Sequence, residues 1–166
     1  MNLINHMAPL FDAPAFLANQ EHGSVSLEAL RGKWVLLFFY PLDFTFVCPT
    51  EIKELQNSIE DFKKLNCEVL SVSVDSTYSH EAWSKKDLGK LDFPMLSDIT
   101  KRMARDYGVL DEKSGVSLRG TFIIDPKGRV QYQLLHNLNV GRNIPELLRA
   151  LTALQTGELC FANWKK

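Results

Sequence analysis

The sequence predicts an α/β fold in which a central mixed β-sheet is flanked by helices, and three observations predict it. Residues 34–40 form an unbroken run of apolar and aromatic side chains, as in a strand buried on both faces. Apolar residues then recur at spacings of three and four from Ile52 to Leu65, which indicates a helix that ends near Asn66. Residues 67–74 alternate and are rich in β-branched side chains, which indicates a second strand. This order of elements builds a layered α/β domain.

The remaining segments continue the alternation. The first 33 residues hold short apolar groups between prolines and glycines, which indicates loops, a small hairpin and a turn at 27–30. We further expect a helix at 79–88 and a strand at 93–96. A helix capped by Asp98 or Thr100 should follow and end at Tyr107, before a polar loop at 111–115. The strands 120–125 and 130–135 should form a hairpin, and a last helix at 143–155 should end at Gly157. Such an order indicates a thioredoxin-like fold.

Composition restricts the function classes. The contents of 45% hydrophobic and 23% charged residues are usual for a soluble globular protein, and we expect one domain over residues 1–166 with a C-terminal tail at 156–166. The formal net charge of -1 predicts no general attraction to nucleic acid or to anionic membranes. The longest apolar run has the length of a strand, and the N-terminus lacks a basic segment followed by an apolar one. We therefore expect a cytoplasmic protein.

The chain has three cysteines, Cys48, Cys67 and Cys160. They are few and odd in number, which argues against a disulfide framework. They favour a reducing compartment, in which a disulfide is transient and catalytic. The chain has no Cys-x-x-Cys pair, which removes the usual zinc and dithiol-exchange signatures, and its four histidines show no metal-ligand spacing. Cys67 opens a predicted strand and has no basic neighbour, which indicates a structural role.

Cys48 is the candidate nucleophile. It follows the predicted central strand and stands at the start of the predicted helix, where Pro49 suits the first turn and Glu51 suits the positive end of the helix dipole. A thiol at this end faces unpaired N–H groups, which favour the thiolate. The carboxyl ends of strands are also where open α/β sheets place reactive groups. The alternative is a small buried residue, a common fate of a free cysteine.

Three neighbours complete the predicted pocket. Thr45 lies three residues before Cys48, and its hydroxyl can turn toward the sulfur. Pro41 can pack over the pocket and exclude water without offering a competing donor. Arg119 directly precedes a predicted buried strand, and its guanidinium can supply a fixed positive charge with several donors. The alternative for Arg119 is an ion pair at the edge of the strand.

These residues carry a resemblance to a known family. The pattern Pro41-x-x-x-Thr45-x-x-Cys48 resembles the peroxidatic loop of the peroxiredoxins, most closely the typical two-cysteine group, which includes the bacterial alkyl hydroperoxide reductase C component. The resemblance extends over nearly the whole chain in the order of that family. The further stretches are 72–76 (VSVDS), 80–83 (HEAW), 93–98 (FPMLSD), 118–125 (LRGTFIID) and 140–142 (VGR).

The resemblance implies a thiol-specific peroxidase that reduces hydrogen peroxide and organic hydroperoxides. Cys48 would attack the O–O bond and become a sulfenic acid, while Thr45 and Arg119 hold the thiolate and the peroxide oxygens. Pro41 would shield the sulfenate. The resemblance also implies that Glu51 and Arg142 form a supporting acidic–basic pair that orients the guanidinium of Arg119.

The resemblance also implies that Cys160 is the resolving cysteine, which condenses with the sulfenic acid to a disulfide. In the family this bond joins two subunits, so an antiparallel homodimer, or a ring of dimers, is implied. A thioredoxin-like protein or a flavoprotein reductase would then restore the thiols, and the resemblance implies no metal and no bound organic cofactor. Phe161 departs from the proline that the family usually has after this cysteine, and residues 86–89 keep only half of the Gly-Gly-Leu-Gly stretch of members sensitive to over-oxidation. We therefore expect Cys48 to resist over-oxidation.

Three alternatives remain at this point. A general thiol-disulfide oxidoreductase on the same fold would use a Cys-x-x-Cys pair, which the chain lacks. A cysteine hydrolase needs a histidine paired with Cys48, and no histidine stands in a stretch that suggests such a pair. An oligomeric scaffold or holdase chaperone is compatible with the composition, as a separate function or as a second role of a peroxidase.

Overall fold

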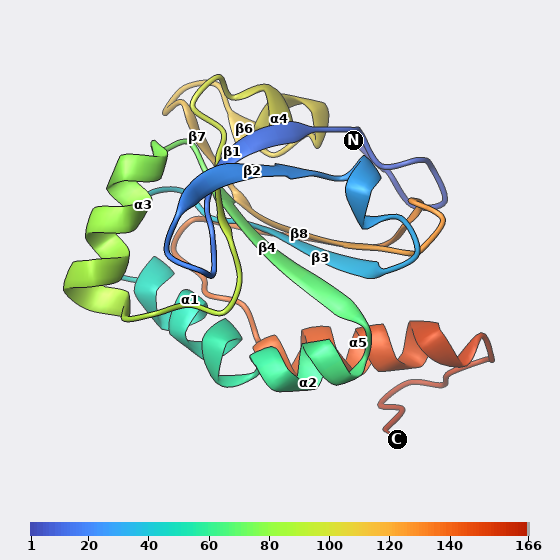
Figure 1. Ribbon diagram of the computed structural model, residues 1–166. Coiled ribbons are helices and arrows are strands. Elements are labelled where there is room, and N and C mark those ends of the chain that lie inside the picture. Colours follow the sequence, from blue (N-terminus) through green and yellow to red (C-terminus); the bar gives the residue numbers. More distant parts are fainter. Residues whose placement is uncertain (166) are drawn as a thin grey trace.

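Seven strands form one mixed sheet in the computed structural model, which describes residues 1–165 (Figure 1). Their order across the sheet is β2-β1-β5-β4-β3-β8-β9. The strands are β1 (Asp12–Phe16), β2 (His22–Ser26), β3 (Trp34–Phe39), β4 (Cys67–Ser73), β5 (Met95–Ser97), β8 (Arg119–Ile124) and β9 (Val130–His136). A separate two-stranded ribbon pairs β6 (Leu110–Asp111) with β7 (Val116–Ser117). These two short strands flank the loop expected at 111–115, and β6 includes its first residue. The thioredoxin-like α/β architecture expected from the sequence is confirmed.

The strand β3 lies in the interior of the sheet, between β4 and β8. It runs parallel to β4 and antiparallel to β8, so that Leu37 lies opposite both Leu70 and Phe122. Alternate side chains of β3 enter two different hydrophobic clusters: Leu36 and Phe38 belong to one, and Leu37 to the other. This burial on both faces explains why the strand is apolar throughout rather than alternating.

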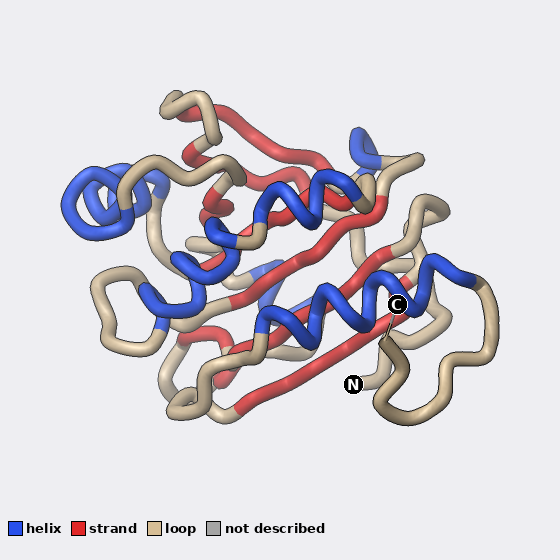
Figure 2. Tube along the Cα trace, turned by 90° about the horizontal axis from the view of Figure 1, so that it is seen from below, coloured by secondary structure: helices blue, strands red, loops and turns tan. Residues whose placement is uncertain are grey.

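Helices cover both faces of the sheet. The helices are α1 (Cys48–Asn57), α2 (Ile59–Lys64), α3 (Thr77–Trp83), α4 (Arg102–Asp106) and α5 (Ile144–Thr156), with short helical turns η1 (Glu28–Leu30) and η2 (Ser84–Leu88). Figure 2 shows α1, α2 and α5 in front of the strands, on one face. The N-terminal segment and α4 pack on the other face, where Ala8 and Met103 join the cluster of Leu37. The helix α3 lies at one side of the molecule (Figure 1).

The single helix predicted to reach Asn66 is wrong. Two helices, α1 and α2, meet at Ser58, whose φ of -98° and ψ of 2° interrupt the helical geometry. Serine is a poor residue for a helix interior because its side chain competes for backbone hydrogen bonds. Apolar spacing continues through the break, since Leu55 and Phe62 both pack in the same cluster, and spacing alone therefore did not reveal it.

The helix ends in the second half follow identifiable caps. Ser76 accepts a hydrogen bond from the N–H of Ser79, so α3 starts two residues before the expected position. The carboxylate of Asp98, and not Thr100, accepts hydrogen bonds from backbone N–H groups at the start of α4. Asn143 caps α5, and Gly157 ends it in the left-handed conformation with a φ of 67°, as expected.

Within residues 1–165, no helix combines the length and the hydrophobicity that crossing a bilayer requires. The same residues contain no group of three side chains arranged to ligate a metal ion.

Candidate active site

Cys48 is the first residue of α1 and is fully buried. The central strand β3 ends at Phe39, and residues 40–47 form the loop that leads from its carboxyl end into the helix. Pro49 stands in the first turn, where a missing N–H costs nothing. The predicted position of the thiol, at a helix start just beyond a central strand, is therefore what the structure shows.

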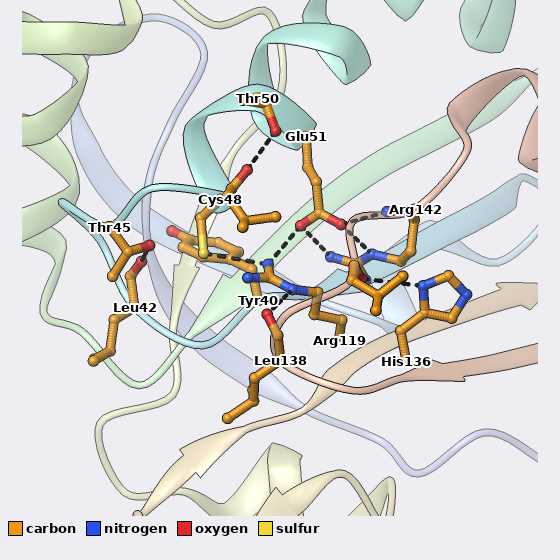
Figure 3. Close-up of polar contacts among 12 residues, drawn as sticks. Tyr40, Leu42, Thr45, Cys48, Thr50, Glu51, Arg119, His136, Leu138 and Arg142 are labelled. Carbon is orange, nitrogen blue, oxygen red and sulfur yellow. Dashed lines mark hydrogen bonds and ion pairs between the residues drawn. The ribbon is translucent and has the colours of Figure 1, made fainter.

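Arg119 meets the sulfur from the neighbouring strand. Because β8 runs antiparallel to β3, the first residue of β8 lies beside the end of β3. Nη1 of Arg119 donates a hydrogen bond to Sγ of Cys48 at 3.3 Å, and Nε donates to the carbonyl of Leu138 at 2.8 Å. The side chain is 3% exposed. The structure thus brings together the predicted cation and the predicted nucleophile (Figure 3).

Glu51 joins two arginines behind the sulfur. Its Oε2 accepts from Nη1 of Arg119 at 2.8 Å, and its two oxygens accept from Nε and Nη2 of Arg142 at 2.9 and 3.0 Å. The backbone N–H of Arg142 donates to the same carboxylate at 2.8 Å. Arg142 also donates to the hydroxyl of Thr121, and its guanidinium stacks 3.3 Å from the ring centroid of Phe38. The predicted pair of Glu51 and Arg142 therefore exists and touches Arg119.

The charges of this cluster are unequal. Two buried guanidinium groups face one buried carboxylate, so the cluster carries one net positive charge next to the sulfur. Burial acts to raise the pKa of Glu51, but hydrogen bonds and charge from Arg142 and Arg119 outweigh it and hold that pKa below its ordinary value. Burial lowers the pKa of Arg142, and Glu51 opposes this shift. A Cys48 thiolate would balance the remaining positive charge.

Thr45 does not point as predicted. Its hydroxyl donates to the carbonyl of Leu42 at 3.1 Å and makes no hydrogen bond to the sulfur. A threonine hydroxyl readily bonds a backbone carbonyl three residues away, and that local bond competes with any more distant partner. Pro41 is buried at the start of the loop, which fits a cover over the pocket.

Cys160 lies in the tail that follows α5. Its Sγ is 3.5 Å from the hydroxyl of Thr156 and 3.7 Å from the carbonyl of Ala153, so the tail folds against its own helix. Figures 1 and 2 agree that this tail and the start of α1 lie at opposite ends of the molecule. The structure therefore does not bring Cys160 to Cys48 of the same chain.

The third cysteine is buried in the sheet. Cys67 opens β4 and is 4% exposed, and burial raises the pKa of its thiol to about 12. A thiol in that state is a poor nucleophile, which agrees with the structural role predicted from the sequence.

A buried polar network next to the loop was missed by the sequence reasoning. Tyr40, Asp43 and His80 form consecutive hydrogen bonds in the interior, and burial, followed by the charge of Asp43, raises the pKa of Tyr40 well above its ordinary value. In the sequence, the network could have been predicted from Tyr40, a tyrosine at the end of an apolar run, and from Asp43, an acidic residue among apolar ones. Both are unusual buried residues and need partners.

Several known proteins have a similar sequence and a similar fold. The family model described as "AhpC/TSA family" matches residues 4–133. A putative peroxiredoxin of Bacillus subtilis is 48% identical over 98% of this chain and 94% of its own. A thioredoxin peroxidase of Trypanosoma brucei rhodesiense is 47% identical over 98% and 86%. The crystal structure of reduced Plasmodium vivax 2-Cys peroxiredoxin has a TM-score of 0.96 and 43% identity, with coverage of 99% of this chain and 90% of that chain.

Fold, site and relatives define the class of this protein as a peroxiredoxin, a thiol-dependent peroxidase and therefore an oxidoreductase. The chain belongs to the AhpC/TSA family.

Proposed function

We propose that the protein reduces hydrogen peroxide and organic hydroperoxides through a sulfenic acid at Cys48. In this step the thiolate attacks one peroxide oxygen, the O–O bond breaks, and the other oxygen leaves as hydroxide or alkoxide. The sulfur is oxidised to S–OH, and the peroxide is reduced by two electrons. The observation that supports the proposal most strongly is the hydrogen bond from Arg119 to a sulfur that is otherwise buried.

Arg119 has a donor left for the substrate. Nη1 and Nε are bonded within the protein, whereas Nη2 makes no hydrogen bond to residues 1–165. No buried side-chain nitrogen or oxygen in this part of the chain lacks a partner, so Nη2 is not sealed from solvent. We assign Nη2 to a peroxide oxygen, where it stabilises the charge that develops as the O–O bond breaks.

The other site residues act around this pair. Glu51 and Arg142 hold the Arg119 guanidinium in place through the buried ion pairs. Pro41 shields the sulfenate from water. Rotation of the Thr45 side chain would turn its hydroxyl from its present partner, the Leu42 carbonyl, to the bound peroxide.

Cys160 of a second copy would resolve the sulfenic acid. Its thiol attacks the Cys48 sulfur, a disulfide forms, and the S–OH oxygen leaves as water. A partner's tail is needed because the chain's own tail lies at the far end of the molecule (Figure 1). This proposal includes a homodimer or a ring of dimers. We place the enzyme in the reducing cytoplasm, where its disulfide would be transient.

A thioredoxin-like protein is the proposed reductant. The names of two relatives support it: the thioredoxin peroxidase of Trypanosoma brucei rhodesiense and the mouse mitochondrial thioredoxin-dependent peroxide reductase. A flavoprotein disulfide reductase is the other candidate. Peroxide consumption measured with thioredoxin and its reductase, and separately with a flavoprotein reductase, distinguishes the two.

Non-reducing electrophoresis after brief peroxide treatment tests the mechanism. Wild type should form a disulfide-linked dimer, and Cys48→Ser and Cys160→Ser should not. Cys67→Ser, a buried cysteine outside the site, is the matched control and should behave as wild type. Normal thioredoxin-dependent turnover by Cys160→Ser would show that its resolving role is wrong.

A further inference from the structure

Between residues 41 and 46 of the loop that leads to Cys48, Asp43 makes the hydrogen bonds to other parts of the described chain. This side chain is buried, and its carboxylate accepts hydrogen bonds from the hydroxyl of Tyr40 at 2.7 Å and of Ser79 at 2.8 Å. His80 lies 2.8 Å from the same carboxylate. The backbone N–H of Asp43 donates to Asp75 at 2.9 Å. Asp43 is thus bonded to the residue that follows β3, to Asp75 two positions after the end of β4, and to α3.

The partners of Asp43 are themselves held by the core. Nε2 of His80 lies 3.0 Å from the carbonyl of Leu96 on β5. A carbonyl only accepts, so Nε2 donates this hydrogen bond, while Nδ1 lies against the Asp43 carboxylate. Asp75 accepts a second hydrogen bond, from the hydroxyl of Ser73 at the end of β4. The anchor therefore ends on two strands of the central sheet.

The rest of the loop has much weaker attachments. Thr45 bonds only the loop's own Leu42 carbonyl, and Phe46 is 95% exposed. Phe44 has a φ of 57°, in the left-handed region that costs energy for a bulky residue. Its ring lies 6.1 Å from the ring of Trp83 on α3, and Nζ of Lys86 lies 5.8 Å from the Phe44 ring centroid. Without Asp43, the strained loop would have little to keep it closed.

We infer that Asp43 is a positioning residue that keeps the loop closed and Cys48 beside Arg119. The effect of Asp43 on the reaction rests on the proposed function, whereas its effect on the position of the loop does not. A disulfide requires a second sulfur about 2 Å away, and the Cys48 sulfur is fully buried, so the loop must open before another thiol can reach it. Asp43 therefore sets how often the sulfenic acid becomes available to Cys160. It also sets how long the sulfenic acid stays in the closed pocket, where a second peroxide can oxidise it.

Asp43→Asn tests this with little change of shape. The amide is uncharged and keeps one accepting oxygen, whereas the hydroxyls of Tyr40 and Ser79 donate to two different oxygens of the carboxylate, so one of these two hydrogen bonds is lost. We expect the loop to open about ten times more often. Asp98→Asn is the matched control, because Asp98 is also buried and accepts hydrogen bonds, from Met103 and Ala104, without touching the loop. If Asp43→Asn does not fold, Ser79→Ala removes one donor from the same carboxylate.

Hydrogen–deuterium exchange of the reduced proteins measures opening without any reaction. Asp43→Asn should speed exchange of the amides of residues 43–50 about tenfold, with α5 unchanged. Asp98→Asn should leave residues 43–50 protected as in wild type. Equal protection of this segment in all three proteins, or an equal loss in both variants, would overturn the inference.

Mass spectrometry after graded hydrogen peroxide then measures the fate of the sulfur. In Asp43→Asn the disulfide should form about ten times faster, and the fraction of sulfinic acid, which a second peroxide produces from the sulfenic acid, should fall. An unchanged ratio of the two products in a protein that exchanges faster would overturn the functional part. If wild type forms no disulfide at all, the proposed function fails, while the exchange result still decides the role of Asp43.

Discussion

Nη1 of Arg119 lies 3.3 Å from Sγ of Cys48, although 71 positions separate the two residues in the sequence. The antiparallel pairing of β8 with β3 creates this contact, because it places the beginning of one strand beside the end of the other. A buried thiol at a helix start and a buried guanidinium thereby form one site. The proposed reaction of Cys48 depends on this arrangement.

Arg119→Lys should slow the reaction of Cys48 with hydrogen peroxide by a factor of about a hundred or more. Lysine keeps the charge, but its three donors share one nitrogen and cannot reproduce the planar guanidinium that reaches the sulfur and Glu51 from one nitrogen and a peroxide oxygen from another. Stopped-flow measurement of the second-order rate constant checks this. Arg129→Lys, at a surface arginine that bonds the carbonyl of Asn5, is the control and should react at the wild-type rate. A wild-type rate in Arg119→Lys would show that the guanidinium geometry is not needed.

Glu51→Gln should lower the free energy of unfolding by about 3 kcal/mol, since it leaves two buried guanidinium groups without their counter-charge. Urea denaturation at neutral pH measures the loss. Glu60→Gln removes an exposed ion pair with Lys63 and should change stability by less than about 1 kcal/mol. Similar losses in the two variants would mean that the buried cluster contributes no more than a surface pair.

The contribution of Glu51 should also depend on pH. Its pKa in the folded protein lies below the ordinary value of 4.5, so the unfolded chain takes up a proton at this group before the folded one does. The stabilisation is therefore fully present above pH 4.5 and is lost as the pH falls through the folded pKa. The difference in unfolding free energy between wild type and Glu51→Gln should shrink from pH 7 to pH 3; a constant difference would contradict this.

Thr45→Val should slow peroxide reduction about tenfold or more, while Thr45→Ser should keep most of the rate, because only serine retains the hydroxyl. Thr50→Val is the control: the Thr50 hydroxyl bonds the carbonyl of Val47 and is not assigned to the substrate. Since Thr45 bonds Leu42 in the structure, the result decides whether its hydroxyl turns during the reaction. Full activity of Thr45→Val would remove Thr45 from the mechanism.

The sequence allowed prediction of what depends on neighbouring residues. Apolar runs identified β3 and the hairpin of β8 and β9, and the order Val47-Cys48-Pro49 identified the start of α1. Arg119 could be chosen because it directly precedes a buried strand, but only the order of strands in the sheet explains its distance to the sulfur.

Features set by tertiary packing could not be predicted in this way. The break at Ser58 leaves the apolar spacing intact, so the pattern suggested one helix. The direction of the Thr45 hydroxyl depends on a backbone carbonyl that loop geometry alone brings within reach. The anchoring of Asp43 joins residues from four separate segments, and no local pattern reports such a meeting.

Oxidation of the Cys160→Ser variant by a single equivalent of hydrogen peroxide tests the central claim most directly, because the resolving thiol is then absent. Peptide mass spectrometry should find one added oxygen, trapped as a sulfenic acid, on Cys48, with the buried Cys67 unmodified. Oxidation of Cys67 while Cys48 stays a free thiol would contradict the account.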